Sequence, residues 1–502
     1  MTLSAFRRIV SVSMASATAI GLIVAVGLAP PATATPCSAP EANIDPPTTP
    51  APMPAPAPVV RPPTGRRPSN ANDRAPLPKL GPLISSLLKP TSPGTRYSAP
   101  LEHQAEVVPP GPNPPGAGNQ PPPNANPLVP NAAPVHPQPA PQPAAQPAPP
   151  PPPASIGGAP TSLVDWVTGP NGPNKTLERF GISGTDLGIP WDNGDPANHQ
   201  TLMAFGDTFG YCKVHGQQWR YNILFRSSEN DLSHGIHVAP GSASDKYSGS
   251  PAWQSGLSKQ IINTIKRAPH ETGLIPTAAM SLGRNQYINF MSIKEWGRDG
   301  QWSTNFSAIA VSPDNGQNWG VYPGSIRASS PDNVPGARFF PGNENFQMGA
   351  FMKGNDGYIY SFGTPSGRGG AAFLSRVPAR SLPDLTKYQY WNGDSNSWVP
   401  ADPSKATPIF PGPVGEMSAQ YNSYLKQYLV LYTDGGSNDV VARTAPAPQG
   451  PWSPEQMLVS SWQMPGGIYA PMIHPLSSGR DLYFNLSLWS AYDVMLMHTV
   501  LP

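Results

Sequence analysis

The chain has 502 residues, of which 12% are charged, and a formal net charge of +2. A chain this close to neutral lacks the large positive charge typical of a nucleic-acid-binding protein, so we exclude nucleic acid as a partner. Its two cysteines, Cys37 and Cys212, permit at most one disulfide and no cysteine-based metal site. We expect no metal ion and no cofactor.

The first residues have the features of an export signal. Arg7 and Arg8 precede a mostly apolar run at residues 10–28, and the Ala-Thr-Ala at residues 32–34 fits a small-x-small cleavage site. We therefore expect a signal peptide at residues 1–34 and a secreted or cell-envelope protein. An uncleaved N-terminal membrane anchor is the alternative.

Residues 35–154 are expected to form a disordered arm rich in proline and alanine. The chain has 71 prolines, and a large share of them precede Ser155, as in APQPAAQPAPPPPPA. Such a stretch has little apolar surface to bury and favours extended polyproline II. One segment, LPKLGPLISSLLKP, has helical spacing of its leucines and predicts a short helix near residues 79–89, which either docks or forms transiently.

Residues 155–502 form one domain that can be written as five repeated units. Each unit has a short apolar strand, a turn, an aromatic-rich second strand, a gap and a third strand. The first two strands read TDLGIP and TLMAFGDTF, then PTAAMSLGRNQYINFMSI, FQMGAFMKGNDGYIYSFGT, EMSAQYNSYLKQYLVLYT and YAPMIHPLSSGRDLYFNLSLW. The pattern predicts an all-β fold, a five-bladed β-propeller, with an irregular β-sandwich as the alternative.

Two further features agree with a propeller. The chain ends on the third strand of unit five, so closing the ring needs an outermost strand from residues 162–169 or 177–182. The stretch SPDNGQNW, residues 312–319, matches an Asp box, a hairpin between the third and fourth strands of a blade. Asp314 would then accept backbone N–H groups in the turn, so we assign it a structural role.

Three acidic residues lie where a propeller has its ligand-binding mouth. The first strand of each blade lines the central channel, and Asp186 and Glu416 start two of these strands without a neighbouring cation in the sequence. Asp207 ends the second strand of unit one, which returns antiparallel to the same mouth. We predict that Asp186 and Asp207 face each other as a catalytic pair. In glycoside hydrolysis one carboxylic acid protonates the leaving oxygen, while a carboxylate activates water or attacks the anomeric carbon.

Other polar and aromatic residues are candidates for substrate binding. For a lone acid such as Glu416 a role in a turn is the alternative, and for His270 a loop role is equally plausible. The candidates are Glu416, Gln347, Thr277, Trp191, His270, Tyr421, Asn422 and Trp489.

The ordered set GTDLG, FGDTFG, LIPTAAM, FQMGAF and EMSAQYN resembles the DUF4185 family over residues 162–502. That family includes endo-acting D-arabinanases of glycoside hydrolase family 183, which cut the D-arabinofuranan of the mycobacterial cell wall. The resemblance implies a monomeric glycoside hydrolase that acts on arabinan in arabinogalactan and lipoarabinomannan, with its catalytic acids at Asp186 and Asp207. The alternatives are a non-catalytic propeller that binds cell-wall polysaccharide, and a scaffold whose arm crosses the peptidoglycan layer.

Overall fold

The computed structural model describes residues 151–211, 219–297 and 301–502. The predicted signal peptide, most of the arm and its short helix lie outside these residues, as do Cys37 and Cys212. All described residues belong to one compact unit of the chain.

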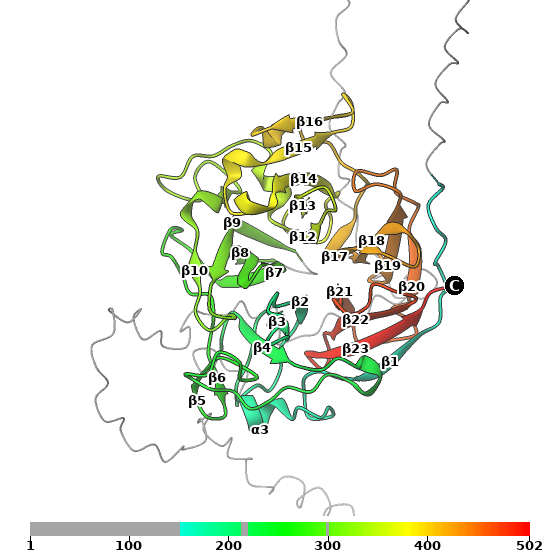
Figure 1. The fold of residues 1–502 in the computed structure, drawn as a ribbon. Helices are drawn as coiled ribbons and strands as arrows, with labels where there is room; N and C mark the ends of the chain where they lie inside the picture. The colour runs from blue at the N-terminus through cyan, green and yellow to red at the C-terminus, as the bar shows by residue number, and fades with distance from the viewer. Residues whose placement is uncertain (1–150, 212–218, 298–300) are drawn as a thin grey trace, which may run out of the picture. The chain divides into compact units, whose positions relative to one another are not determined.

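The described residues form five antiparallel sheets of three to five strands and one two-stranded ribbon (Figure 1). Sheet one comprises β2 (Ile189–Asp192), β3 (Thr201–Phe205) and β4 (Ile223–Ser227). Sheet two comprises β7 (Gly273–Leu282), β8 (Asn285–Trp296), β9 (Trp302–Ser312), β10 (Gly320–Val321) and β11 (Arg327–Ala328). Sheet three comprises β12 (Met348–Lys353), β13 (Tyr358–Thr364), β14 (Phe373–Pro378), β15 (Gln389–Asn392) and β16 (Ser397–Pro400).

Sheet four comprises β17 (Val414–Asn422), β18 (Gln427–Asp434), β19 (Val440–Ala445) and β20 (Gln456–Val459). Sheet five comprises β21 (Ile468–Ile473), β22 (Asp481–Leu488), β23 (Asp493–Val500) and β1 (Thr161–Trp166). The ribbon is β5 (Ala252–Gln254) with β6 (Leu257–Ser258). The helices are α3 (Thr176–Phe180) and six short 3₁₀ turns, Leu232–His234, Pro323–Ser325, Asn343–Phe346, Ala379–Ser381, Leu385–Lys387 and Pro403–Lys405. None of the helices among the described residues is long and apolar enough to cross a membrane.

The first strands of the five sheets form a ring. β2, β7, β12, β17 and β21 each contact the next, β21 contacts β2, and all lie around the centre of Figure 1. This is the arrangement of a β-propeller, so the predicted all-β propeller is confirmed, and the five sheets follow the chain order of the five predicted units.

The sequence of β3 shows why these strands are apolar throughout. Leu202 and Ala204 pack in a core between sheets one and two, whereas Met203 and Phe205 pack in a core between sheets one and five. Because side chains alternate across a strand, a strand with a sheet on each side must be apolar at every position. Similar cores lie between the other neighbouring sheets, and one more lies among the inner strands.

The ring closes through the N-terminal part of the domain. β1 pairs antiparallel with β23, the last strand of sheet five. Of the two predicted closing segments, residues 162–169 therefore contain the closing strand. The other, residues 177–182, lies largely in α3 and does not form a strand, because Lys175 and Gly181 take left-handed conformations that delimit one helical turn.

The predicted Asp box is present between β9 and β10. Asp314 accepts hydrogen bonds from the Ser312 hydroxyl (2.8 Å) and the Asn318 backbone N–H (2.9 Å). Burial opposes the ionised form of Asp314, but the hydrogen bonds from Asn318 and Ser312 outweigh it and hold the pKa of Asp314 below its usual value. Gly316 has φ +79°, and the Trp319 indole N–H donates to its carbonyl (2.9 Å). The structural role predicted for Asp314 is confirmed.

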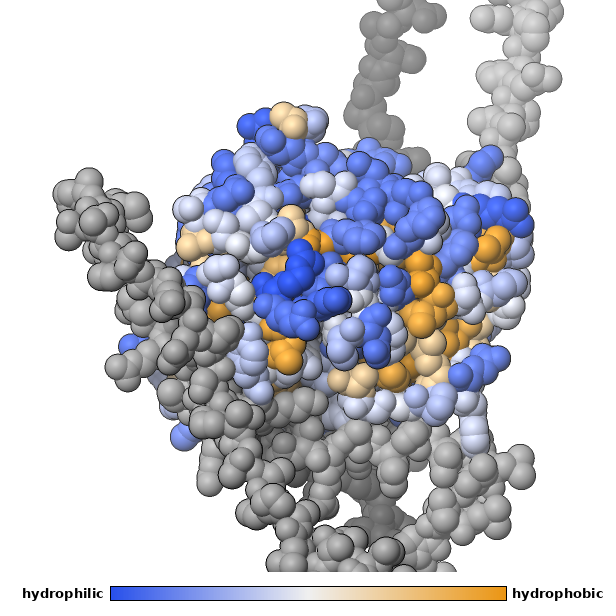
Figure 2. Space-filling view, turned by 90° about the horizontal axis from the view of Figure 1, so that it is seen from below, coloured by the Kyte–Doolittle hydropathy of each residue, from blue (hydrophilic) through white to orange (hydrophobic). Residues whose placement is uncertain are grey.

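The surface is mostly polar with scattered apolar side chains. Figure 2 shows one face, on which hydrophilic residues surround separate hydrophobic patches. The most exposed large apolar side chains in the described part are Met457 at 49% and Trp462 at 47%, on or just after β20.

Candidate active site

The backbone brings the segments that carry Asp186 and Asp207 together. Residues 183–186 lead into β2, and residues 206–209 follow β3. The Gly206 N–H donates to the Asp186 carbonyl (3.1 Å), and the hydroxyls of Thr185 and Thr208 are 2.7 Å apart. Both aspartates therefore lie at the end of sheet one where its inner strand begins.

Asp186 points toward the inner strand of sheet five. Its Oδ2 accepts a hydrogen bond from the hydroxyl of Tyr469, 3.0 Å away, at the start of β21. Burial and, secondly, the charge of Asp186 raise the pKa of Tyr469 well above its usual value, so this phenol remains a donor. A Cβ on Gly206 would lie 2.4 Å from Asp186 Oδ1, so only glycine leaves room for the carboxylate.

A buried arginine completes the cluster around Asp186. Arg368 donates two hydrogen bonds to Glu416, with Nε–Oε2 2.9 Å and Nη2–Oε1 2.7 Å. Its guanidinium lies over the rings of Tyr469 and Trp302, at 5.0 and 5.5 Å from their centroids. Burial acts to lower the pKa of Arg368, but the charge and hydrogen bonds of Glu416, together with the charge of Asp186, outweigh it and raise that pKa. The ion pair and Asp186 thus belong to one electrostatic cluster.

The strand starts around this cluster have irregular backbones. Leu187 and Ala470, which follow Asp186 and Tyr469 directly, have φ of 71° and 55°. The pairing register shifts near the starts of β7, β17 and β21. Left-handed non-glycine residues and β-bulges are concentrated at functional sites, where they redirect side chains.

Asp207 has different partners from Asp186. It is 4% exposed, and its Oδ1 accepts a hydrogen bond from the indole N–H of Trp219 at 2.9 Å. Burial, then the charges of Asp207 and Glu271, raise the pKa of Tyr221 above its usual value. Burial also raises the pKa of Glu271, whose Oε2 accepts a hydrogen bond from Ser292 at 2.8 Å.

Among the predicted substrate-binding residues, Glu416 and Gln347 lie near the starts of β17 and β12, Trp489 directly follows β22, and Thr277 lies within β7. The Gln347 amide is bonded to Thr304 (2.9 Å) and to two backbone carbonyls, at 2.9 and 3.1 Å. Thr277 accepts a hydrogen bond from the Asn289 amide at 2.7 Å. The half-buried ring of Trp489 packs on Tyr469, with centroids 5.8 Å apart.

Four predicted substrate-binding residues have other environments. Trp191 is 4% exposed and its indole N–H donates to Gln286 (2.8 Å), so it packs between sheets one and two and offers no face to a sugar. His270 is exposed on the loop before β7, where its carbonyl accepts a hydrogen bond from Asn305.

Tyr421 and Asn422 end β17, whereas Glu416 lies near its start. Six residues of extended strand put Asn422 about 20 Å from Glu416, at the other end of the channel. The assignment of these two residues to substrate binding beside Glu416 is therefore corrected, because they end the inner strand that Glu416 begins.

No role at the site was predicted from the sequence for Arg368, Tyr469 or Trp219. Arg368 lies in a loop between β13 and β14, with the sequence SGRGG. A lone basic residue in a glycine-rich loop beside an inner strand is the signal that could have found it. Nothing in the sequence indicates that its partner is Glu416.

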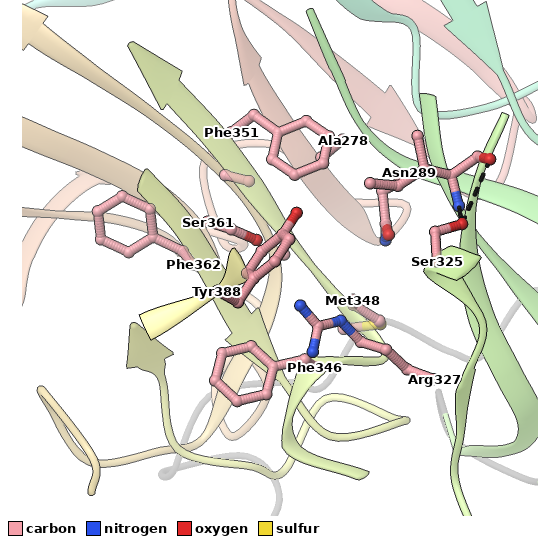
Figure 3. A pocket seen from close by; sticks show the side chains of 13 residues that line it. Ala278, Asn289, Ser325, Arg327, Phe346, Met348, Phe351, Ser361, Phe362 and Tyr388 are labelled. Atoms are coloured by element: carbon pink, nitrogen blue, oxygen red, sulfur yellow. Dashed lines mark hydrogen bonds between the residues drawn. The ribbon is translucent and has the colours of Figure 1, made fainter. Parts of the chain in front are cut away.

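A small hollow beside Arg327 lies where sheets two and three pack together, and it is too small to be a ligand site (Figure 3). Its volume is about 10 Å³, room for one water molecule at most. Arg327 lies 4.6 Å from the ring centroid of Tyr388 and donates to the Tyr390 hydroxyl at 2.6 Å. These contacts of Arg327 link sheet two to sheet three.

Solved structures similar to this chain include glycoside hydrolases, but the likeness is distant. A glycosyl hydrolase from Bacteroides ovatus is 12% identical, with a TM-score of 0.39, and the match covers 68% of this chain and 94% of that one. The arabinanase Arb43A from Bacillus subtilis is 11% identical, with a TM-score of 0.35, covering 62% and 95%. At these values neither likeness supports a conclusion about activity.

Two curated fungal proteins are more similar in sequence. Notoamide biosynthesis cluster protein J' from Aspergillus versicolor is 28% identical over 326 residues, which are 62% of this chain and 83% of that protein. Notoamide biosynthesis cluster protein J from Aspergillus sp. (strain MF297-2) is 26% identical over 328 residues, covering 62% and 81%. Residues 171–498 match the family model described as "Domain of unknown function (DUF4185)", and the chain belongs to this family.

Proposed function

We propose that this protein is a secreted, monomeric glycoside hydrolase of the cell envelope that cleaves D-arabinofuranosyl linkages in cell-wall arabinan. The observation that carries the proposal is the pairing of residues 183–186 with 206–209, which holds Asp186 and Asp207 at one end of sheet one. Two carboxyls on adjoining segments at the mouth of a propeller are the minimum that acid/base glycosidic cleavage needs.

The surroundings of the two aspartates suggest how they divide the chemistry. Arg368, whose charge interacts with Asp186, favours the ionised form of that carboxylate. Asp207 is almost fully buried. Burial disfavours the ionised form of a carboxyl. We therefore assign Asp186 as the nucleophile or base and Asp207 as the acid that protonates the leaving oxygen.

Tyr469 and Arg368 are positioning residues in this scheme. The Tyr469 hydroxyl fixes one oxygen of Asp186 through its 3.0 Å hydrogen bond. Arg368 is in turn fixed by Glu416, so Glu416 acts through Arg368 and not on the substrate directly. This differs from the substrate-binding role expected for Glu416 from its strand position.

The proposal is tested by incubating the purified protein with arabinogalactan and lipoarabinomannan and analysing the products. Folded Asp186→Asn and Asp207→Asn variants should each lose at least about a hundredfold in kcat, since removing an acid or base costs about 10²–10⁴ in rate. Asp394→Asn, in the exposed turn between β15 and β16, is the matched control and should be unaffected. Near-native turnover in either catalytic variant would refute the pair.

Varying the leaving group of the substrate distinguishes the roles assigned to Asp186 and Asp207. Asp207→Asn should recover activity on aryl arabinofuranosides as the leaving phenol becomes more acidic, because such a group needs no proton. Asp186→Asn should stay inactive on the same series. The reverse pattern would exchange the two roles. Saccharide binding without turnover by the native protein would favour the non-catalytic polysaccharide-binding alternative.

A further inference from the structure

A cavity of about 320 Å³ lies between sheets two and three. Its walls come from the end of β8, the start of β9, the loop after β11, the turn before β12 and the loop after β13. The lining residues that matter here are Glu295, Ser303, Asn333, Glu344, Gln347 and Ser366. Its volume is at the lower end of the range of small-molecule sites, about 300–1,000 Å³.

The cavity adjoins the cluster around Asp186. Ser303 follows Trp302 directly, and Ser366 is two residues before Arg368. Arg368, which pairs with Glu416, has its guanidinium 5.5 Å from the Trp302 ring centroid, so residues close in sequence to this cluster line the cavity. Gln347 lines the cavity and also leads into the inner strand β12.

The inner part of the cavity is fixed by hydrogen bonds. Asn333 Oδ1 accepts from Lys294 Nζ at 2.7 Å, and Asn333 Nδ2 donates to the Thr304 carbonyl at 3.0 Å. The Gln347 amide bonds Thr304 at 2.9 Å. The rim is solvated, with Glu295 and Ser303 both exposed. A preformed floor below a polar rim can bind a ligand without a large ordering cost.

The chemistry of the lining favours a neutral, hydroxyl-rich ligand. Serine and threonine hydroxyls, two amides and two carboxylates offer donors and acceptors to a polyol. The cavity contains two glutamates and a single lysine, which is bonded to Asn333. This excess of negative charge disfavours phosphorylated or carboxylated sugars.

We infer that this cavity is a subsite for a neutral sugar unit of the same glycan whose linkage lies at Asp186 and Asp207. The inference rests on the proposed function for the identity of that glycan. It adds that the protein contacts the glycan beyond the cleaved bond, toward sheets two and three, and thus gains affinity from chain length.

Ser303→Trp tests the subsite, because an indole at this exposed position would occupy the cavity without disturbing the core. Kinetics would be measured on arabino-oligosaccharides of two to eight units and on an aryl arabinofuranoside. We expect KM for the longer substrates to rise by about tenfold or more, with kcat and the aryl substrate little changed, which is the pattern for lost uniform binding. Ser397→Trp, an equally exposed change on the distant edge strand β16, is the control and should match the native protein.

Calorimetric binding of the same oligosaccharides to Asp186→Asn, with and without Ser303→Trp, gives a readout that does not need turnover. Native-like KM and affinity in the Ser303→Trp proteins would overturn the subsite while leaving the hydrolase proposal intact. If the native protein turns over no glycan but Ser303→Trp weakens oligosaccharide binding, the subsite is upheld and hydrolysis is refuted. Neither binding nor turnover of these sugars would overturn both.

Discussion

Replacing Arg368 by methionine should reveal how strongly the protein depends on its buried ion pair. The side chains of Arg368 and Glu416 are 16% and 13% exposed and share two hydrogen bonds. Methionine keeps most of the volume of the arginine and removes its charge, leaving the Glu416 carboxylate, which is only 13% exposed, without its partner. Breaking one side of a buried pair costs about 3–5 kcal/mol, whereas replacing both partners by apolar groups is often neutral.

The free energy of unfolding, measured by urea at pH 7, should therefore fall by about 3–5 kcal/mol in Arg368→Met, roughly a 10²- to 4 × 10³-fold change in the unfolding constant. The double variant Arg368→Met/Glu416→Leu should recover most of this loss. Since Asp186 also loses a nearby positive charge, catalytic turnover should fall in both variants. The stability and activity readouts thus separate the structural and electrostatic effects of Arg368.

The matched control is Arg284→Met, which removes a pair with Asp195 whose arginine is 65% exposed. Exposed pairs contribute about 0–1 kcal/mol, and Asp195 keeps hydrogen bonds from Ala197 and Tyr247. The reasoning is refuted if Arg368→Met loses no more stability than Arg284→Met, or if the double variant is as unstable as the single one.

Four further changes have expected outcomes that urea unfolding or activity assays can check. Burial raises the pKa of Glu271, so the protonated carboxyl favours the folded state at low pH, and this contribution is lost as pH rises. Glu271→Gln should therefore be more stable than the native protein at pH 8 and equally stable at pH 4. Burial lowers the pKa of His474 to about 3, so at this position only the unfolded chain binds a proton between pH 6.5 and 3. The free energy of unfolding should therefore decrease as pH is lowered from 6.5 to 3, and His474→Gln should make this decrease smaller. Gly206→Ala should reduce kcat with little loss of stability, because its methyl group would meet the Asp186 carboxylate, and native kcat would contradict this contact. Removing all residues through Ala154 should cost about 1–3 kcal/mol, because Ala154 bonds Gln427 and Thr444 on sheet four, whereas a domain beginning at residue 151 should keep native stability.

The fold class was readable from the sequence because strand, turn and gap recur with a fixed order. Apolar runs such as Leu202 to Phe205 reflect burial on both faces, and glycine-rich turns between them reflect local backbone requirements. The Asp box is equally local, since every hydrogen bond of Asp314 is made within five residues. Local chemistry therefore predicted the elements and their order.

The site depended on contacts that the sequence does not encode locally. Arg368 and Glu416 are 48 residues apart, and Tyr469 and Asp186 are 283 apart. The ring of inner strands brings these pairs together, so neither partner can be inferred from its neighbours in the chain.

Direction and burial were likewise decided only by the tertiary structure. Tyr421 belongs to an inner strand as expected but lies at its far end, and Trp191 is covered by sheet two. A strand pattern has a period of two residues whatever element covers the strand, so it cannot distinguish a buried indole from an exposed one. The packing of one sheet against the next makes that distinction.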